Sequence, residues 1–470
     1  MKRLIVIALM LAAFTAQAQL EINKGPESRS ISPSKLDNAS YIGAHDSLNV
    51  WVMATRHGWK VMGFDHKMAL SGAAELRTKA DELLTATING NSATLILAER
   101  TKRNVSVLVA HVGLDGTTAV DTLTTYAITS RKDRCLLWGA TSPMGDKMGV
   151  VAIVEFAETK EYTSVAYVLD MTGKEIYHKE YAMGSMQQMY VTDDGRIVTL
   201  DINRIGKQST LTVNYVTPEY ALSGDTTVNC DPIREMDIVN VVGDRMLAIG
   251  TINGPGRKGD KLCGGVVAFA YDLSSSTMIN FNIRQFSTED VNVLYNRPTK
   301  KVGGETMPQN VSTVGILAMP YGGVIALSRN FDKVTTHDNG TTTHQYTRMG
   351  LHVVAFNADG EVVWSHNIRR NDISKKDGDM LRVGLFAIGD KLCIIKNESP
   401  KLPVDYDISY TAKEMFENKR SNIAIYDIAS DGFVGKTIIE TKSKHKVFTT
   451  TPEGDVITVR GHHVREITVE

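Results

Sequence analysis

Cysteine is scarce in this chain of 470 residues, which has only Cys135, Cys230, Cys263 and Cys393. No two of them are close in sequence, and this excludes the CxxC spacing of redox and zinc sites. Cys135 and Cys393 have apolar neighbours, so both are expected to be buried free thiols within strands. Cys230 and Cys263 form the one pair for which a disulfide is worth testing.

Familiar catalytic motifs are also missing. The sequence contains no Gly-x-Ser-x-Gly elbow, no His-Glu-x-x-His pair and no phosphate loop. These absences argue against the common hydrolases, metalloproteases and nucleotide-dependent enzymes. His337, Asp338 and His344 share one segment, but their spacing matches no standard metal site. No metal and no cofactor are therefore expected.

Neither sign of charge dominates, because 52 basic residues face 53 acidic ones and the net charge is -1. Such a balance gives no whole-molecule attraction to nucleic acid or to an anionic membrane. The expected partners are therefore a protein or a glycan, with no nucleic acid and no membrane insertion.

Long apolar runs are confined to the start of the chain. Lys2 and Arg3 precede an apolar stretch, Leu4 to Phe14, that is too short to span a membrane. Ala16-Gln17-Ala18 follows with the small residues of a signal-peptidase site. Residues 1–18 are therefore predicted to be a signal peptide. The mature protein is expected to be soluble, in the periplasm or outside the cell.

The chain does contain a repeated pattern of short strands. An apolar strand A ends in a tight turn such as Asn89-Gly90 or Asp194-Gly195, and an apolar strand B follows. Strands C and D are joined by turns such as Asp359-Gly360. Eight A strands begin near residues 39, 81, 129, 185, 235, 311, 380 and 444. Four-stranded units of about 40 to 50 residues repeated around a ring are β-propeller blades.

The sequence therefore predicts an all-β propeller over residues 19–470, with eight blades and seven as the alternative. The last unit is too short for four strands. Its missing strand is expected from the mature N-terminus, within Leu20 to Ser32. Both ends of the chain would then share one sheet, and the ring would have no open edge.

Two segments that join strands C and D carry a family resemblance. Val354–Trp364 (VAFNADGEVVW) and Ala166–Tyr177 (AYVLDMTGKEIY) resemble repeats of bacterial PQQ-like and WD40-like propellers. Each has an aromatic residue four positions after the turn glycine, where it would pack between neighbouring blades. The resemblance implies the fold and not an activity. Quinone-dependent dehydrogenases of that family carry adjacent cysteines, which this chain lacks.

Extra length is concentrated on one side of the predicted ring. In such blades the B–C and D–A connections emerge on one face, and the A–B and C–D turns emerge on the other. The long connections are Ile252–Gly264, Asn330–Met349 and Asn397–Ser421 between strands B and C, and Phe286–Asn310 between D and A. Long loops without regular structure are often functional. This face over blades five to seven is therefore predicted to bind a partner, with tolerated surface insertions as the alternative.

Charged residues recur at the ends of the B strands, near the predicted channel mouth on that face. They are Arg56, Arg100, Glu155, Asp201, Arg329, Lys396 and Arg460, while the fifth unit has Thr251. Such a mouth can orient a polar ligand, because arginine grips a carboxylate or sulfate with two hydrogen bonds. The alternative is that strands leaving a core simply enter water, where charges belong.

Two turns near the ring closure add further ligand-binding candidates. Arg56-His57-Gly58-Trp59 and Arg460-Gly461-His462-His463 become neighbours if the ring closes as predicted. Together they would bind a sugar through stacking on Trp59 and hydrogen bonds from arginine and histidine. Taken separately, each is equally compatible with an ordinary hairpin turn.

The expected function is that of an exported, non-catalytic propeller that binds a protein or glycan partner through its loop-rich face. The rival is a glycan-active hydrolase or lyase with polar residues at the channel mouth. Because glycoside hydrolysis uses two carboxyl groups, Glu155 and Asp201 on adjacent blades are the first catalytic pair to measure. Two unrelated solvated acids would give the same sequence pattern.

Overall fold

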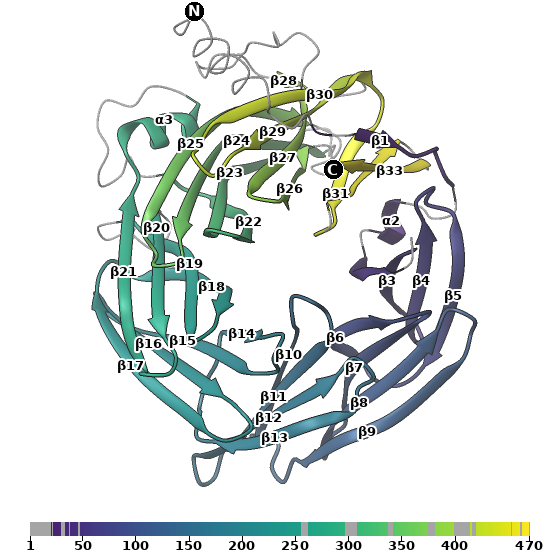
Figure 1. Ribbon diagram of the computed structural model, residues 1–470, viewed down its shortest axis with the longest axis vertical. Coiled ribbons are helices and arrows are strands. Elements are labelled where there is room, and N and C mark those ends of the chain that lie inside the picture. The colour runs from purple at the N-terminus through teal and green to yellow at the C-terminus, as the bar shows by residue number, and fades with distance from the viewer. Residues whose placement is uncertain are drawn as a thin grey trace, which may run out of the picture.

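The computed structural model arranges the chain as eight sheets around a central channel (Figure 1). It describes residues 20, 22–29, 33–36, 38–45, 48–254, 262–296, 308–336, 342–374, 381–398, 414–415, 420–452, 454–460 and 463–469. The fold is the predicted eight-bladed β-propeller, and the seven-bladed alternative is wrong. The predicted signal peptide lies outside the described residues.

The first four blades follow one another along the chain, each with its strands in sequence order. Blade I consists of β2 (Ala39–His45), β3 (Leu48–Thr55), β4 (Gly58–Asp65) and β5 (Leu70–Arg77). Blade II consists of β6 (Glu82–Asn89), β7 (Ser92–Arg100), β8 (Asn104–Gly113) and β9 (Thr118–Ala127). Blade III consists of β10 (Arg134–Thr141), β11 (Lys147–Phe156), β12 (Glu161–Asp170) and β13 (Glu175–Tyr181). Blade IV consists of β14 (Gln188–Val191), β15 (Ile197–Ile205), β16 (Gln208–Val216) and β17 (Ala221–Asn229).

The later blades carry the additions to this plan. Blade V consists of β18 (Ile233–Val242), β19 (Arg245–Asn253), β20 (Cys263–Asp272) and β21 (Thr277–Gln285). Blade VI consists of β22 (Val311–Met319), β23 (Gly322–Thr336), β24 (Thr342–Asn357), β25 (Val362–Ser374) and the short β28 (Glu414–Met415). Blade VII consists of β26 (Val383–Ile388), β27 (Lys391–Glu398), β29 (Ser421–Ile428) and β30 (Val434–Ser443). Blade VIII consists of β31 (Lys446–Thr450), β32 (Val456–Arg460), β33 (His463–Val469) and β1 (Ile22–Lys24).

The hydrophobic core lies between the blades. Eight clusters of buried side chains occur, and each joins residues of two neighbouring blades. The middle strands have a neighbouring blade against both of their faces. In β7, for example, every residue from Ala93 to Ala98 is buried, whereas the outer strand β9 is largely exposed. This explains why the B strands have continuous apolar sequences and the outer strands do not.

The two aromatic residues that follow the C–D turns pack as the sequence predicts. Trp364 belongs to the cluster between blades VI and VII, and Tyr177 donates a hydrogen bond to the carbonyl of Gly195 in blade IV at 2.8 Å. Gly432 lies under Trp364 and has a φ of 85°. A Cβ at Gly432 would lie 3.1 Å from the Cβ of Trp364. The turn therefore needs glycine both for its backbone conformation and for this close packing.

The ring is closed by the two ends of the chain, as predicted. Strand β1 pairs antiparallel with β33, with Ile22 opposite Val469 and Lys24 opposite Ile467. Ser28 and Val464 exchange two backbone hydrogen bonds of 2.8 and 2.9 Å. The N-terminal segment thus covers the outer edge of β33.

An ion-pair cluster strengthens this closure. The Glu27 carboxylate contacts Nε2 of His445 at 2.9 Å, Nη2 of Arg460 at 2.5 Å and Nδ1 of His463 at 3.2 Å. The hydrogen bond from His445 and the nearby positive charges lower the pKa of Glu27. Arg460 is therefore engaged in holding the N-terminal segment on blade VIII.

The seam between blades VIII and I contains a carboxyl group whose pKa is raised, in contrast to that of Glu27. Glu466 is 4% exposed and accepts a hydrogen bond of 2.8 Å from Nδ2 of Asn49 in blade I. Burial, together with the charges of Asp455 and Asp65, raises the pKa of Glu466 to about 7. The folded state thus favours the protonated acid. The stability that this protonated carboxyl contributes is present below the pKa that Glu466 has in the unfolded chain. It is lost as the pH rises towards 7.

We therefore expect Glu466→Gln to stabilise the protein at pH 8 by about 2 kcal/mol and to have little effect at pH 5. The glutamine keeps the acceptor for Asn49 and carries no charge that must be buried. Thermal unfolding followed by circular dichroism at the two pH values measures the difference. An equal shift at both pH values would contradict this assignment.

All four cysteines are free thiols, and Cys135, Cys263 and Cys393 are buried. The prediction of buried thiols at Cys135 and Cys393 is confirmed, and no disulfide joins Cys230 to Cys263. Burial raises the pKa of Cys135 and Cys263 to about 11 and that of Cys393 to about 12. These three groups are protonated at neutral pH and are not reactive thiolates.

Candidate functional site

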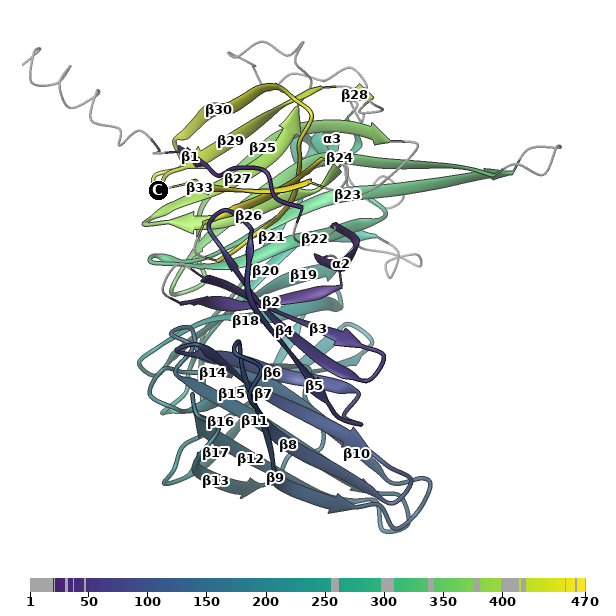
Figure 2. The ribbon, with the colours of Figure 1, turned by 90° about the vertical axis from the view of Figure 1, so that its right-hand side faces the viewer.

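The connections between strands are longer on one face of the ring than on the other. The A–B and C–D turns are short, whereas the B–C and D–A side carries a long hairpin and a helix (Figure 2). We call the first the turn face and the second the loop-rich face. None of the helices in the described ranges has the length and apolarity needed to cross a bilayer.

Two of the four long connections have regular structure, contrary to prediction. Asn330–Met349 is mostly a continuation of β23 and β24, whose pairing extends to Thr336 opposite Thr342. Phe286–Asn310 contains helix α3 (Thr288–Tyr295). The predicted loops were wrong because strand pairing and a capped helix satisfy the backbone there. Residues 255–261 and 399–413 of the other two connections lie outside the described part of the chain.

Helix α3 is fixed by a buried polar network. Its N-cap Ser287 and Asp290 form a capping box. The Asp290 carboxylate also accepts hydrogen bonds from Arg284 and from Asn367, both at 2.9 Å. Nη1 of Arg284 lies 3.0 Å from Nε2 of the fully buried His352. Burial opposes ionisation of Asp290, but His352, Arg284 and Asn367 lower the pKa of Asp290 to about 2.

The residues at the ends of the B strands are mostly used in contacts within the ring. Arg100 pairs with Glu82 at 2.9 Å and donates to the carbonyl of Cys135 in the next blade at 2.8 Å. The Arg329 guanidinium lies 4.4 Å from the ring centroid of Tyr295. This contact joins strand β23 to helix α3.

Lys396 and one of the two candidate carboxylates, Asp201, have partners within the fold, whereas Glu155 is exposed. Lys396 is buried and pairs with the buried Glu398 at 3.3 Å. Asp201 accepts a hydrogen bond from Ser185 at 2.5 Å. Glu155 is exposed at the end of β11, opposite Arg134. These contacts occupy side chains that were predicted to face a ligand.

The candidate residues of the first blade are divided between surface and core. Arg56 and His57 are exposed on the turn that joins β3 and β4. Trp59 is 8% exposed, packs in the cluster between blades I and II and donates to the carbonyl of Ala80 at 3.1 Å. Little of its ring is accessible to a sugar. His462 lies outside the described residues.

A groove on the loop-rich face between blades VI and VII has the composition of a binding site. Its cavity of about 480 Å³ lies beside the base of the projecting hairpin. It is lined by Ser312, Thr313, Val314, Ser328, Asn330, Tyr346, Arg348, Arg370, Leu381, Arg382 and Val383. These residues contain three arginines and no carboxylate. We refer to this cavity as the arginine groove.

Arg370 is the most buried of the three arginines. Its side chain is 3% exposed, and its Nε contacts the carboxylate of the buried Asp372. Nη2 donates to the carbonyl of Leu381, at the start of blade VII. Towards the described residues Arg370 uses only these two nitrogens, so Nη1 remains as a donor for a ligand.

Arg348 and Arg382 stand on the two sides of the groove. Nη1 of Arg348 contacts Asp332 at 2.6 Å on the long hairpin. The Arg382 guanidinium lies 4.7 Å from the ring centroid of Phe448 and donates to the Phe448 carbonyl at 3.3 Å. These contacts hold both long side chains in place, which reduces the entropy lost when a ligand binds.

The groove continues into the central channel. A neighbouring cavity of about 340 Å³ shares Val314, Arg382 and Val383 with it and reaches Leu385 and Phe448. A ligand held by the arginines therefore has room to extend along the channel wall. Hydroxyl and amide groups of Ser312, Thr313, Ser328, Asn330 and Tyr346 line the remainder of the groove.

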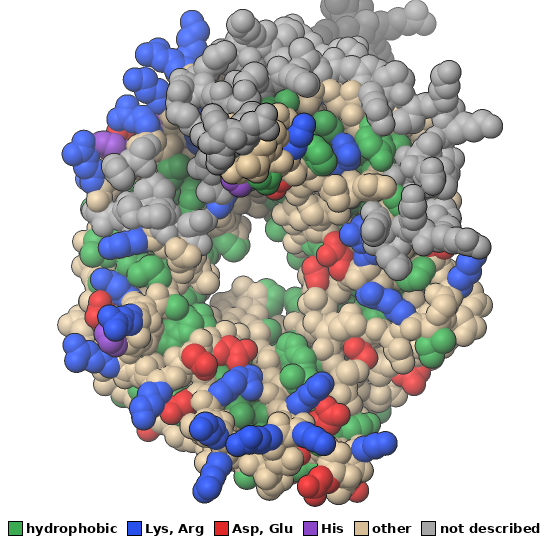
Figure 3. Space-filling view, turned by 180° about the vertical axis from the view of Figure 1, so that it is seen from behind, with side chains coloured by type: hydrophobic (Ala, Val, Ile, Leu, Met, Phe, Trp, Pro, Cys, Tyr) green, Lys and Arg blue, Asp and Glu red, His purple; other side chains and the backbone are tan. Residues whose placement is uncertain are grey.

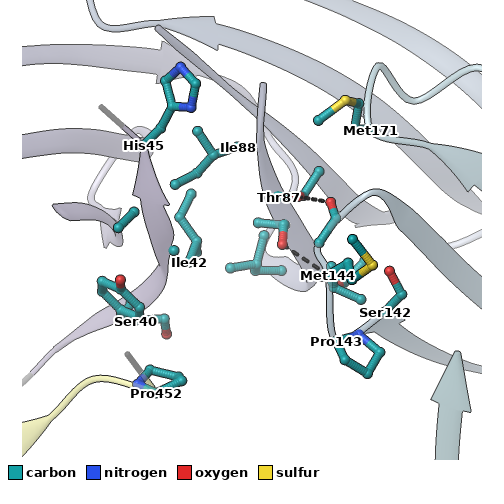
Figure 4. Close-up of a pocket in the computed structure, with 18 of the residues that line it drawn as sticks. Ser40, Ile42, His45, Thr87, Ile88, Ser142, Pro143, Met144, Met171 and Pro452 are labelled. Carbon is teal, nitrogen blue, oxygen red and sulfur yellow. Dashed lines mark hydrogen bonds between the residues drawn. The ribbon is translucent and has the colours of Figure 1, made fainter. Parts of the chain in front are cut away.

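A larger cavity of about 690 Å³ lies on the channel side of blades I to III (Figure 4). Ser40, Ile42, Ile88, Pro143 and Met144 are among its lining residues, which contain no lysine, arginine or carboxylate. Hydroxyl groups there are used internally, as between Thr85 and Thr141 at 2.6 Å. We therefore regard the arginine groove as the better candidate, because its lining selects a ligand by charge.

The described residues contain no group of three His, Cys, Asp or Glu side chains that could hold a metal ion. His344 stacks on Tyr346 with a centroid distance of 6.3 Å. His337 and Asp338 lie outside the described part of the chain.

The three arginines of the groove were not predicted from the sequence as ligand-binding residues. The available signal was their position: each lies in or beside a connection on the face that was predicted to bind. Arg348 lies next to the end of the predicted Asn330–Met349 insertion, Arg370 lies in the last part of β25 (Val362–Ser374), and Arg382 directly precedes β26. Their convergence depends on pairing between strands that the sequence does not specify.

No family model and no curated protein matches the chain. Among solved structures, the chain is similar to the Dos1 propeller, with a TM-score of 0.35 and 11% identity over 74% of this chain and 73% of that one. It is also similar to the β-propeller domain of the Trilobed protease from Pyrococcus furiosus, with a TM-score of 0.27 and 10% identity over 69% and 90%. A third is the polysaccharide lyase Uly1, with a TM-score of 0.34 and 8% identity over 84% and 91%. With TM-scores below 0.5, these likenesses carry no inference about the role of this chain.

Proposed function

We propose that the protein is an exported, non-catalytic propeller that binds an acidic glycan in the arginine groove. The observation that carries this proposal is the lining itself, in which three arginines meet without a carboxylate. Asp332 and Asp372 hold Arg348 and Arg370 in place but are not among the lining residues. The lining therefore presents guanidinium groups and no carboxylate, and the two aspartates offset part of the charge from outside the cavity.

The neutral part of the lining favours a sugar over a simple anion. Carboxylate or sulfate groups fit the planar N–H donors of arginine. The surrounding Ser312, Thr313, Ser328 and Asn330 match the hydroxyl groups of a sugar ring, and the Tyr346 ring offers a surface for stacking. A uronic acid or sulfated sugar combines these features in one residue.

A lyase that acts on the same ligand is the second candidate. The observation that favours it is the phenol of Tyr346 in the same cavity as the arginines. Arginine would neutralise the uronate carboxylate, and the tyrosine would take the C5 proton as a phenolate and pass it to the leaving glycosidic oxygen, while the C4–O bond breaks and the C4=C5 double bond forms. Hydrolysis is not favoured, because the lining offers neither of the two carboxyl groups that it uses.

Titration calorimetry with a trimer of galacturonic acid and with maltotriose tests the binding site. Arg348→Gln and Arg382→Gln are each expected to weaken trimer binding by about tenfold or more, since each removes a charge-assisted hydrogen bond. Arg245→Gln is the matched control, because Arg245 forms a similar pair with Asp359 at 2.9 Å on the turn face.

Binding of maltotriose as strongly as the acidic trimer would contradict the proposal, as would groove variants with unchanged affinity. Incubation with polygalacturonate separates binding from catalysis. An increase in the ultraviolet absorbance of an unsaturated uronate, lost in Tyr346→Phe, would replace the binding role with the lyase role.

A further inference from the structure

The short turns make the turn face acidic. Asp115 accepts a hydrogen bond from the backbone N–H of Thr117 at 3.0 Å, and Asp272 accepts one from Ser275 at 2.8 Å. These backbone hydrogen bonds lower the pKa of both carboxyl groups. Aspartate is the residue that closes such turns, so the geometry of the turns places negative charge on this face.

The B–C turns of blades I, II and IV are basic on the loop-rich face, and that of blade III carries Lys160 beside the exposed acids Glu158 and Glu161. Their exposed basic side chains are Arg56, Lys102, Arg103, Lys160, Arg204 and Lys207. None of these is required to close its turn through a side-chain hydrogen bond to the backbone of that turn. The fold therefore does not require basic residues at these positions, whereas the turns of the turn face do use aspartate.

The D–A connections between blades I, II and III extend the same charge. Their exposed basic side chains are Arg77, Lys79, Arg131, Lys132 and Arg134. We call these and the basic side chains of the B–C turns the basic rim. Lys and Arg side chains accordingly gather over the lower half of the loop-rich face (Figure 3).

Two acids near the rim are engaged within the fold, whereas Asp81, Glu155, Glu158 and Glu161 are exposed on the same face. Glu82 pairs with Arg100 at 2.9 Å. Asp133 accepts backbone hydrogen bonds from Ser130 at 2.8 Å and from Ala157 at 3.0 Å. The turn face therefore has an excess of acidic side chains, and the loop-rich face over blades I, II and IV has an excess of basic ones.

From this separation of charge we propose that the basic rim holds a long acidic polysaccharide, one residue of which occupies the arginine groove. The inference rests on the proposed function and extends it from a single sugar to a polymer. The rim and the groove open on the same face of the ring, so one flexible chain can reach both. A polymer with a charge on every residue gains from each additional basic side chain that it passes.

The shape of the face favours a flexible chain over a flat anionic surface. The β23–β24 hairpin projects from this face beside the groove (Figure 2). A bilayer resting on the described part of this hairpin would be held away from Arg370, whose side chain is 3% exposed. A polysaccharide chain can instead bend into the groove and continue across the rim.

Binding of polygalacturonate and of its trimer to two triple variants tests the proposal. The rim variant carries Lys102→Gln, Arg103→Gln and Lys132→Gln, and the control carries Lys67→Gln, Lys174→Gln and Arg245→Gln on the turn face. The two variants lose the same charge from exposed positions. At low salt we expect the rim variant to bind the polymer about tenfold more weakly and with a shallower salt dependence, because exposed charges act additively and are screened. Its affinity for the trimer should be unchanged, and the control should match the wild type.

The possible failures are distinguishable. Unchanged polymer binding by the rim variant would overturn the rim while leaving the groove intact. Absent trimer binding in the wild type, with polymer binding still lost in the rim variant, would overturn the groove instead. Tighter binding to phosphatidylserine vesicles or to duplex DNA than to the polysaccharide, again lost in the rim variant, would overturn the choice of ligand.

Discussion

A protein that lacks residues 19–29 should unfold about 5 °C below the wild type. The deletion removes β1, its pairing with β33 and the two hydrogen bonds between Ser28 and Val464. It also removes the partner of His445, Arg460 and His463, since all three contact Glu27. Hydrogen bonds of about 1 kcal/mol each, with the lost apolar burial of Ile22, amount to about 5 kcal/mol.

Differential scanning calorimetry measures this change, and Glu27→Gln is the control. That variant keeps the strand and loses only the charge, so we expect it to unfold about 1–2 °C below the wild type and above the deletion. A synthetic peptide of residues 19–32 should raise the unfolding temperature of the truncated protein. If the truncated protein unfolded within 2 °C of the wild type, the ring would not depend on its N-terminal strand.

Asp290→Ala should destabilise the protein by about 3–5 kcal/mol, because it leaves buried partners without their counter-charge. Asp290 accepts hydrogen bonds from Arg284, Asn367 and the backbone of Ser287, and its side chain is 2% exposed. The loss should also free helix α3, so amide exchange in Thr288–Tyr295 should become faster.

Glu289→Ala is the matched control for this prediction. Glu289 is an exposed acid in the same first turn of α3, so its removal costs only a weak interaction with the helix dipole. Chemical denaturation of both variants measures the difference. Equal destabilisation by the two substitutions would show that the buried network contributes nothing beyond the helix terminus.

Much of the fold could be predicted because propeller blades depend on local signals. Turn pairs such as Asp194-Gly195 mark the hairpins, and Gly195 has the expected positive φ of 82°. The short last unit required a strand from elsewhere, and β1 supplies it between Ile22 and Lys24. These inferences needed only the spacing of turns and the rule that an open edge must be covered.

Helix α3 was missed although its signal is present. The sequence Ser287-Thr-Glu-Asp290 is a capping box with Asp in place of Glu or Gln, and Val291, Val293 and Leu294 are buried behind it. The eight residues of α3 are too few to show a clear helical period. The hairpin of β23 and β24 was missed for another reason, because its exposed strands lack the apolar alternation that marks a strand.

The candidate site could be predicted as a face but not as a set of side chains. The extra length of the B–C and D–A connections indicated the face of the ring from which the hairpin and α3 extend. The charged residues at the B-strand ends proved to be largely engaged within the ring, as Arg329 is with Tyr295. Arg348, Arg370 and Arg382 meet only because blade VI lies beside blade VII, and that proximity arises from non-local packing.

The position of a bound ligand tests the central claim most directly. A crystal structure of the protein with the galacturonic acid trimer should show one carboxylate within hydrogen-bond distance of at least two of Arg348, Arg370 and Arg382. Density for the trimer at another site, with the groove holding only solvent at saturating ligand, would contradict the account.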